Sequence, residues 1–178
     1  MTLLKIAGMP KFLVGVRKTL TGPNWDKIWV VKVTIYVDGT TVAGGAYFAN
    51  DDNSGHIRVY SYVRTELRWN QVGSVINGDE PDDNLVMISL SSNGERVATS
   101  TGAANKRIGY VRVYDLVENE WLRVGSKIPG QKVEEDFGSS ISLSSDGTRL
   151  AVGAPSKGAE ESMKGVMRLF DIAAPFKA

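Results

Sequence analysis

Short runs of alternating apolar and polar residues, separated by turn residues, recur along the chain. Ile141-Ser-Leu-Ser144 alternates strictly, and alternation with a period of two predicts a β-strand with one face on a core. Asn-Gly or Asp-Gly pairs follow such runs at 38–39, 93–94 and 146–147. These pairs predict tight hairpins in which both central residues take positive φ. Since no segment shows a helical period, the pattern predicts an all-β protein.

One strand pattern occurs three times, with a glycine first, then an arginine between apolar residues, then an aromatic residue. The copies read Gly55-His-Ile-Arg-Val-Tyr60, Gly109-Tyr-Val-Arg-Val-Tyr114 and Gly165-Val-Met-Arg-Leu-Phe170, spaced by 54 and 56 residues. Trp69 and Trp121 follow the first two copies at matching positions. A repeat of this length is typical of a supersecondary unit that buries its faces only against its neighbours. We therefore expect a stack of units, each with four short antiparallel strands.

The third unit carries the most specific motifs. Asp136-Phe-Gly138 precedes the alternating run, and Gly153-Ala-Pro155 ends the small apolar strand that follows the turn. Together with the arginine strand, these motifs resemble an FG-GAP repeat of the integrin-α-like β-propeller type, over roughly residues 30–172. Unit two departs from the motif, with Leu85-Val86 in place of Phe-Gly. WD-repeat propellers, with units of about 40–45 residues, are the second choice.

The resemblance implies blades of four antiparallel strands. We predict an atypical N-terminal segment at 1–28, blade 1 at 29–74, blade 2 at 85–127, an incomplete blade 3 at 136–172 and a tail at 173–178. Propellers close with about four to eight blades, so about three blades predict an incomplete ring with apolar, open end faces. We therefore expect self-association or a protein partner that completes the propeller, rather than a free monomer.

Composition narrows the classes of function. The 178 residues include no cysteine and one histidine, with a formal net charge of +1. The lack of cysteine excludes disulfides, thiol nucleophiles and cysteine metal sites, and near-neutral charge gives no field that favours nucleic acid. The longest apolar stretch, near Ile28–Val37, is far below the roughly 18 residues of a membrane span. We expect a protein that is not an enzyme, binds no nucleic acid and spans no membrane; its compartment is left open.

Acidic residues gather just before the first strand of blades 2 and 3. The candidate interaction residues are Asp79, Glu80, Asp82, Asp83, Glu134, Glu135 and Asp136. Asp83 and Asp136 lie 53 residues apart, so both loops are expected on one face, where they could bind a cation or a basic partner. The plainer alternative is a pair of solvated loops. We expect the repeated arginines, Arg58, Arg112 and Arg168, to stack on aromatic rings and pair with neighbouring acids.

The leading hypothesis is a non-enzymatic protein-binding or scaffolding module in an oligomer or larger assembly, because propeller loops present a broad, rigid face. The alternative is a carbohydrate- or cation-binding module that uses tryptophans or acidic loops. The resemblance also implies calcium, since FG-GAP repeats of the integrin kind often bind it. Calcium takes about six to eight oxygen ligands, and the turns at 91–95 and 144–148 lack an Asp-x-Asp-x-Asp-Gly pattern. We therefore expect no cofactor.

Overall fold

The computed structural model describes residues 30–35, 39–46, 52–101, 108–155 and 165–174. Within these ranges every regular element is a β-strand and no residue lies in a helix, which confirms the all-β prediction. The predicted N-terminal segment, 1–28, lies outside the described residues, as do residues 175–178 of the predicted tail.

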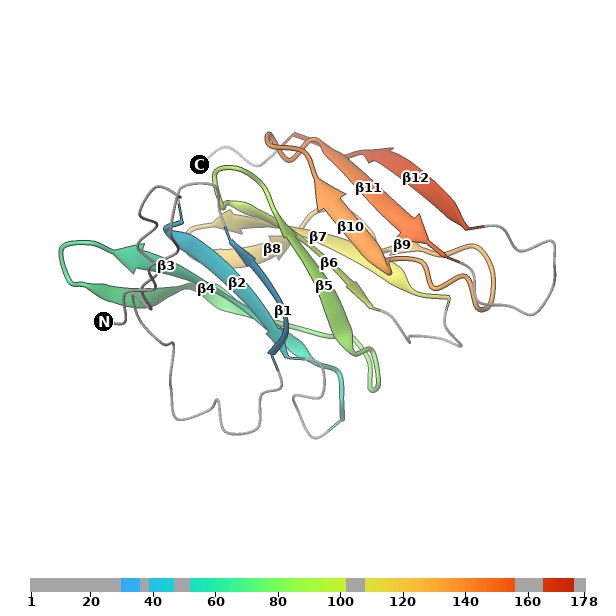
Figure 1. The fold of residues 1–178 in the computed structure, drawn as a ribbon, viewed down its shortest axis with the longest axis horizontal. Coiled ribbons are helices and arrows are strands. Elements are labelled where there is room, and N and C mark those ends of the chain that lie inside the picture. Colours follow the sequence, from blue (N-terminus) through green and yellow to red (C-terminus); the bar gives the residue numbers. More distant parts are fainter. Residues whose placement is uncertain (1–29, 36–38, 47–51, 102–107, 156–164, 175–178) are drawn as a thin grey trace, which may run out of the picture.

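Three antiparallel sheets follow one another in chain order (Figure 1). Sheet 1 comprises β1 (Val30–Ile35), β2 (Thr41–Ala46), β3 (His56–Val63) and β4 (Arg68–Asn77). Sheet 2 comprises β5 (Leu85–Leu90), β6 (Arg96–Thr101), β7 (Tyr110–Val117), β8 (Glu120–Arg123) and β9 (Ile128–Pro129). Sheet 3 comprises β10 (Ser140–Leu143), β11 (Arg149–Ala154) and β12 (Val166–Asp171). Strands adjacent in sequence pair within each sheet, except that β9 pairs with β7.

Strand register is the same in all three sheets. Each repeated arginine lies opposite an equivalent position of the preceding strand, in the pairs Arg58–Gly44, Arg112–Thr99 and Arg168–Val152. A shift of one residue would turn every side chain to the other face. The shared register therefore makes the sheets copies of one unit.

Two apolar clusters hold the sheets together. The cluster between sheets 1 and 2 contains Ala43, Ile57, Val59, Ile76, Leu85, Ile88, Val97, Tyr114 and Trp121. The cluster between sheets 2 and 3 contains Ala98, Val111, Val113, Phe137, Leu150, Val152 and Ala154. Successive side chains of a strand point to opposite faces, so Val97 and Ala98 of β6 enter different clusters. Sheet 2 is thus covered on both faces.

The hairpin turns predicted at 93–94 and 146–147 form, but with a different backbone; residue 38 of the third predicted turn lies outside the described residues. Gly94 has a φ of 73°, whereas Asn93 is not among the residues with positive φ. The Gly94 amide donates to the Ser91 carbonyl at 3.1 Å, and the Asn93 side chain accepts from the Glu95 amide at 3.1 Å. This side-chain bond supports the turn with a single left-handed residue, the glycine. Turn 144–148 repeats the arrangement.

Sheet 3 is the least complete of the three. β12 pairs with β11, whereas its counterparts β3 and β7 also pair with a following strand. The described residues therefore form an incomplete propeller-like stack, which confirms the predicted fold class.

Candidate functional site

The two acidic loops are each built around one buried carboxylate. Asp83 accepts hydrogen bonds from the backbone amides of Asp79, at 2.8 Å, and Glu80, at 2.9 Å. Glu135 accepts in the same way from the amides four and three residues before it. The counterpart of Asp83 is therefore Glu135 rather than Asp136, because unit three has one more residue between this loop and its first strand.

Left-handed residues flank both carboxylates. Asp82 and Asn84 have φ of 60° and 50°, and Glu134 and Asp136 have φ of 57° and 52°. A non-glycine residue costs about 1–2 kcal/mol in this region. The hydrogen bonds inside each loop offset that cost, so the backbone shape of the loops depends on Asp83 and Glu135.

Two of the three repeated arginines, Arg112 and Arg168, pair with these loops, as predicted. The third, Arg58, has a buried Nε with no hydrogen-bond partner among the described residues. Arg112 forms an ion pair with Asp79, and its guanidinium lies 5.8 Å from the ring centre of Tyr110. Arg168 forms an ion pair with Glu135 and lies 5.3 Å from the ring centre of Phe137. Arg112 and Arg168 therefore fasten the two acidic loops to the third strands of sheets 2 and 3.

The charge of Glu135 is stabilised in place. Burial by itself raises the pKa of this carboxyl, but hydrogen bonds from Arg168 and from the Gln131 and Lys132 amides outweigh burial and hold the pKa below its usual value. Glu135 is ionised at neutral pH as a consequence, and the ion pair with Arg168 is intact.

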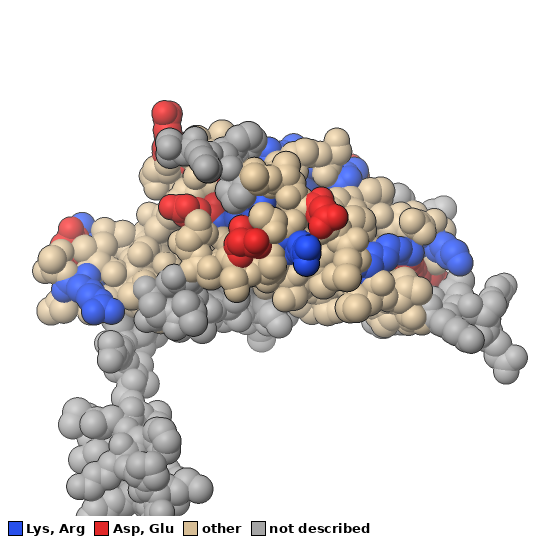
Figure 2. Space-filling model, turned by 90° about the horizontal axis from the view of Figure 1, so that it is seen from above, with Lys and Arg blue, Asp and Glu red and all other residues tan. Residues whose placement is uncertain are grey.

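The candidate acidic residues do not behave as one set. Asp83, Glu135 and Asp136 are buried, and each takes part in hydrogen bonds or other interactions of the chain. Asp79 is bound by both Arg112 and Arg123. Glu80, Asp82 and Glu134 are exposed. Figure 2 shows basic and acidic side chains interspersed over one side of the molecule. The role of these residues in binding a cation or partner stays a prediction.

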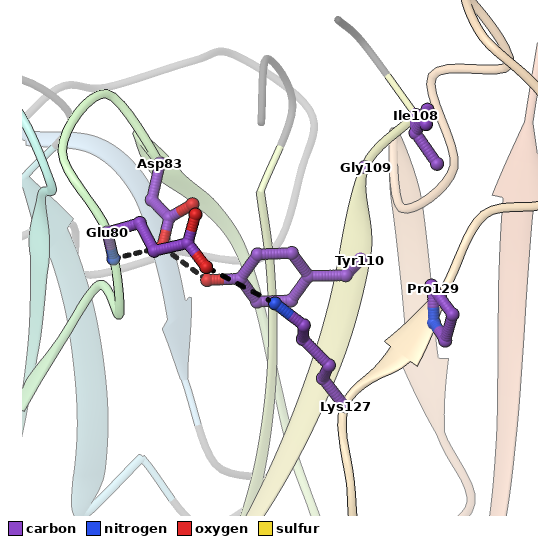
Figure 3. Close-up of a pocket in the computed structure, with 7 residues that line it drawn as sticks. All are labelled: Glu80, Asp83, Ile108, Gly109, Tyr110, Lys127 and Pro129. Carbon is purple, nitrogen blue, oxygen red and sulfur yellow. Dashed lines mark hydrogen bonds and ion pairs between the residues drawn. The ribbon is translucent and has the colours of Figure 1, made fainter. Parts of the chain in front are cut away.

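A hollow of about 280 Å³ lies beside the first acidic loop, lined by Glu80, Asp83, Ile108, Gly109, Tyr110, Lys127 and Pro129. Figure 3 shows the hydroxyl end of Tyr110 directed at Asp83, with Lys127 beside the ring and facing Glu80. The Tyr110 hydroxyl donates to Asp83. Lys127 Nζ lies 3.5 Å from Glu80 Oε1 and 5.0 Å from the Tyr110 ring centre.

The polar groups of this hollow are engaged with one another. Burial, then the hydrogen bond and charge of Asp83, raise the pKa of Tyr110, so its hydroxyl keeps its proton and donates it to Asp83. Lys127 is held by Glu80.

The tryptophans that suggested carbohydrate binding have other contacts. Trp121 is 7% exposed and belongs to the cluster between sheets 1 and 2, where its Nε1 donates to the Val72 carbonyl at 3.0 Å. Trp69 is half-buried and its ring lies 5.3 Å from that of Tyr62. Trp121 therefore joins two sheets and presents little ring surface to a ligand.

Equivalent apolar positions have different environments at the two internal joints and at the sheet 3 end of the stack. Ile57 and Val59 of β3 are fully buried by sheet 2, and Val111 and Val113 of β7 are buried by sheet 3. The corresponding residues of β12, Met167 and Leu169, are 70% and 72% exposed. We call the side of sheet 3 that carries these two residues the open face. The sequence predicted open end faces but did not single out these side chains.

The described residues hold neither a metal-ligand cluster nor a membrane-crossing helix. No cluster of three or more histidine, cysteine or acidic side chains suited to a metal ion occurs among them. None of their elements is a helix of the length and apolarity that crossing a membrane requires.

Comparison with known proteins places the fold. No family model and no curated protein matches the sequence. Among solved structures, that of the eukaryotic initiation factor superposes with a TM-score of 0.55 at 14% identity. The match covers 85% of this chain and 32% of that chain. That neighbour is a propeller-type protein. The fold is propeller-like.

Two other neighbours agree in fold and differ in description. A complex of KlAtg21 with the coiled coil of AgAtg16 gives a TM-score of 0.57 at 19% identity, over 80% of this chain and 39% of that one. A Bacteroides uniformis protein thought to be a 6-phosphogluconolactonase gives 0.54 at 17% identity, over 85% and 40%. The propeller-like chain spans well under half the length of these neighbours, and at such identities the likeness concerns the fold alone.

Proposed function

We propose that this chain is a non-enzymatic protein-binding module, built on FG-GAP-like propeller repeats, that works as part of an oligomer or larger assembly. The observation that carries the proposal is the open face. Met167 and Leu169 occupy positions that another sheet covers at both internal joints. Exposed apolar surface of this kind marks a protein interaction site.

The FG-GAP-like part of the proposal is supported by how its motif residues are used. Phe137 is fully buried in the cluster between sheets 2 and 3. Gly138 has a φ of 95°, and a Cβ there would lie 2.7 Å from the Cβ of Ser100. The Phe-Gly pair thus fills the joint between two sheets and allows their close approach. This use suits the pair to the contact between two stacked sheets.

The non-enzymatic part is supported by the polar groups of the hollow beside the first acidic loop. Tyr110, Asp83, Glu80 and Lys127 bind one another, and the buried carboxylates hold loop backbone. These contacts give the side chains a structural role in holding the loops. The rigid loops then serve as a platform, which suits a module that binds other proteins.

The proposal is tested with tagged full-length chain recovered from cells, with its partners identified by mass spectrometry and the binding remade from purified components. We expect one stoichiometric partner, either another protein or a second copy, that is lost when Met167→Glu and Leu169→Glu are combined. Leu122→Glu is the matched control, because Leu122 is 47% exposed on β8, away from the open face. A chain that is monodisperse and monomeric, without such a partner, would contradict the proposal.

A further inference from the structure

The joint between sheets 2 and 3 contains a specific polar contact beside its apolar cluster. Arg96, the first residue of β6, donates from Nη1 to the Gly147 carbonyl at 2.7 Å and to the Ala173 carbonyl at 2.8 Å. A Cβ on Gly147 would lie 2.8 Å from Cδ of Arg96. Arg96 therefore lies directly on the turn glycine of the next sheet.

The joint between sheets 1 and 2 uses the same positions. Thr41, the first residue of β2, occupies the place of Arg96, and a Cβ on Gly94 would lie 3.4 Å from Cγ2 of Thr41. Both internal joints thus follow one rule. The residue that opens the second strand of a sheet covers the turn glycine of the sheet that follows.

At each end of the stack, only one of the two residues that form this contact is present among the described residues. Arg149 opens β11 of sheet 3, where its side chain is 77% exposed and meets Asp171 at 3.7 Å. Gly39 is the turn glycine of sheet 1, with a φ of 71°, and no described atom lies within 4 Å of where its Cβ would be. Arg149 has no glycine to cover, and Gly39 has no side chain over it among the described residues.

We infer that the open face of one chain binds sheet 1 of a second copy, head to tail, with Arg149 over Gly39 of the other copy. The inference rests on the proposed function and names its partner. The contact continues the two internal joints, with Met167 and Leu169 in the places of Val111 and Val113. Two copies joined twice in this way place the six sheets of their described residues in one closed ring, within the range of about four to eight blades found in propellers.

A second copy of the chain fits this surface because the resulting ring closes. A head-to-tail contact uses two different surfaces, so it generates either a closed ring or an open filament. Arg149 and Gly39 belong to the same chain, and a ring of two copies pairs each Arg149 with a Gly39.

The mass of the purified chain in solution, measured by light scattering over a range of concentrations, tests the dimer. We expect twice the 19.3 kDa of one chain, and the single-chain mass when Met167→Glu and Leu169→Glu are combined. Leu122→Glu should keep the dimer. A wild-type mass that stays at one chain, or a dimer that survives the double variant, overturns the inference.

Cross-linking tests the head-to-tail arrangement, and the chain is suited to it because it has no cysteine. Arg149→Cys in one preparation and Thr40→Cys in another are mixed and treated with a short bis-maleimide. We expect a covalent dimer in the mixture and none in either preparation alone. Cross-linking of Arg149→Cys to itself would instead show a symmetric face-to-face contact and overturn the arrangement.

The outcomes separate this inference from the proposed function. If the wild-type chain stays monomeric but binds a different protein through Met167 and Leu169, the second copy is wrong and the proposed function holds. If it stays monomeric and the open face binds nothing, both are wrong.

Discussion

The joint between sheets 2 and 3 and the open face of sheet 3 are built from equivalent residues in different surroundings. In the joint, Val111 and Val113 are covered by Leu150 and Val152. On the open face, Met167 and Leu169 are covered by no described residue and are at least 70% exposed. The repeat thus places apolar side chains for a neighbour at every unit, whether or not the stack supplies one.

Equivalent ion pairs of sheets 2 and 3 differ in the same way. Arg96 and Asp115 form a two-pronged ion pair, at 2.5 and 2.8 Å, with side chains 1% and 2% exposed. Arg149 and Asp171 form the same pair at 3.7 Å, with side chains 77% and 94% exposed. The covering sheet, rather than the residue types, turns a loose surface pair into a buried one.

The largest expected effect comes from the two arginines. Arg96→Ala leaves Asp115 buried without its charge partner and should lower the free energy of unfolding by about 3–5 kcal/mol. Arg149→Ala in the single chain should cost less than about 1 kcal/mol, because its pair is exposed. Urea unfolding followed by tryptophan fluorescence measures both, and similar costs for the two would show that the sheet cover does not matter.

The next effect compares two left-handed glycines. Gly109, with a φ of 75°, lies at the joint, where a Cβ would be 2.1 Å from the Phe137 carbonyl oxygen, whereas Gly125, with a φ of 65°, has open space. Alanine at either position costs about 1–2 kcal/mol from backbone strain. At Gly109 the overpacking adds about 1–3 kcal/mol more. Thermal unfolding of the two variants should show the difference, and equal midpoints would contradict the close joint.

A third comparison uses equivalent valine and leucine positions. Val113→Ala removes buried methyl groups from the joint and should cost about 2 kcal/mol. Leu169→Ala, on the open face, should stay within about 0.5 kcal/mol of the wild type in the single chain. The measurement is made at protein concentrations at which light scattering gives the mass of one chain, so that association does not add to stability. A large cost at Leu169 would mean that the open face is covered within one chain.

The smallest effect is the pH dependence from Glu135. Its pKa is held below the usual 4.5, so its contribution to stability is full above that value and is lost as the pH falls through the lowered pKa. Glu135→Gln should therefore flatten the acid side of the stability profile. Glu134→Gln, at an exposed neighbouring position, should not. Thermal midpoints from neutral to acid pH measure this, and identical profiles for Glu135→Gln and wild type would contradict the ion pair with Arg168.

Much of the fold was predictable because the same pattern of strands and turns occurs three times in the sequence. The arginine strand, the Asn-Gly and Asp-Gly turns and the alternation at Ile141–Ser144 each recur at a fixed spacing. They identified the strands and turns without any long-range information. The backbone of the turns was not predictable from the dipeptide alone, because the Asn93 side chain bonds to the Glu95 amide and favours a single left-handed residue.

The candidate site was harder to predict. Alignment by strands put Asp136 opposite Asp83, since a single extra residue between loop and strand leaves no mark in composition. Burial of Asp83 and Glu135 depends on Tyr110 and Arg168, which come from β7 and β12. The exposure of Met167 and Leu169 could be found only by comparing the same position across the sheets, once the structure showed which faces were covered.

The central claim is that the open face is covered when the protein is in its working assembly. The most direct measurement is the rate of maleimide labelling of Leu169→Cys against Leu122→Cys, in the native assembly and in the dissociated chain. Because the chain has no other cysteine, each rate reports one position. The account predicts that assembly slows labelling at 169 strongly and leaves 122 unchanged. Equal labelling of Leu169→Cys in both states would contradict it.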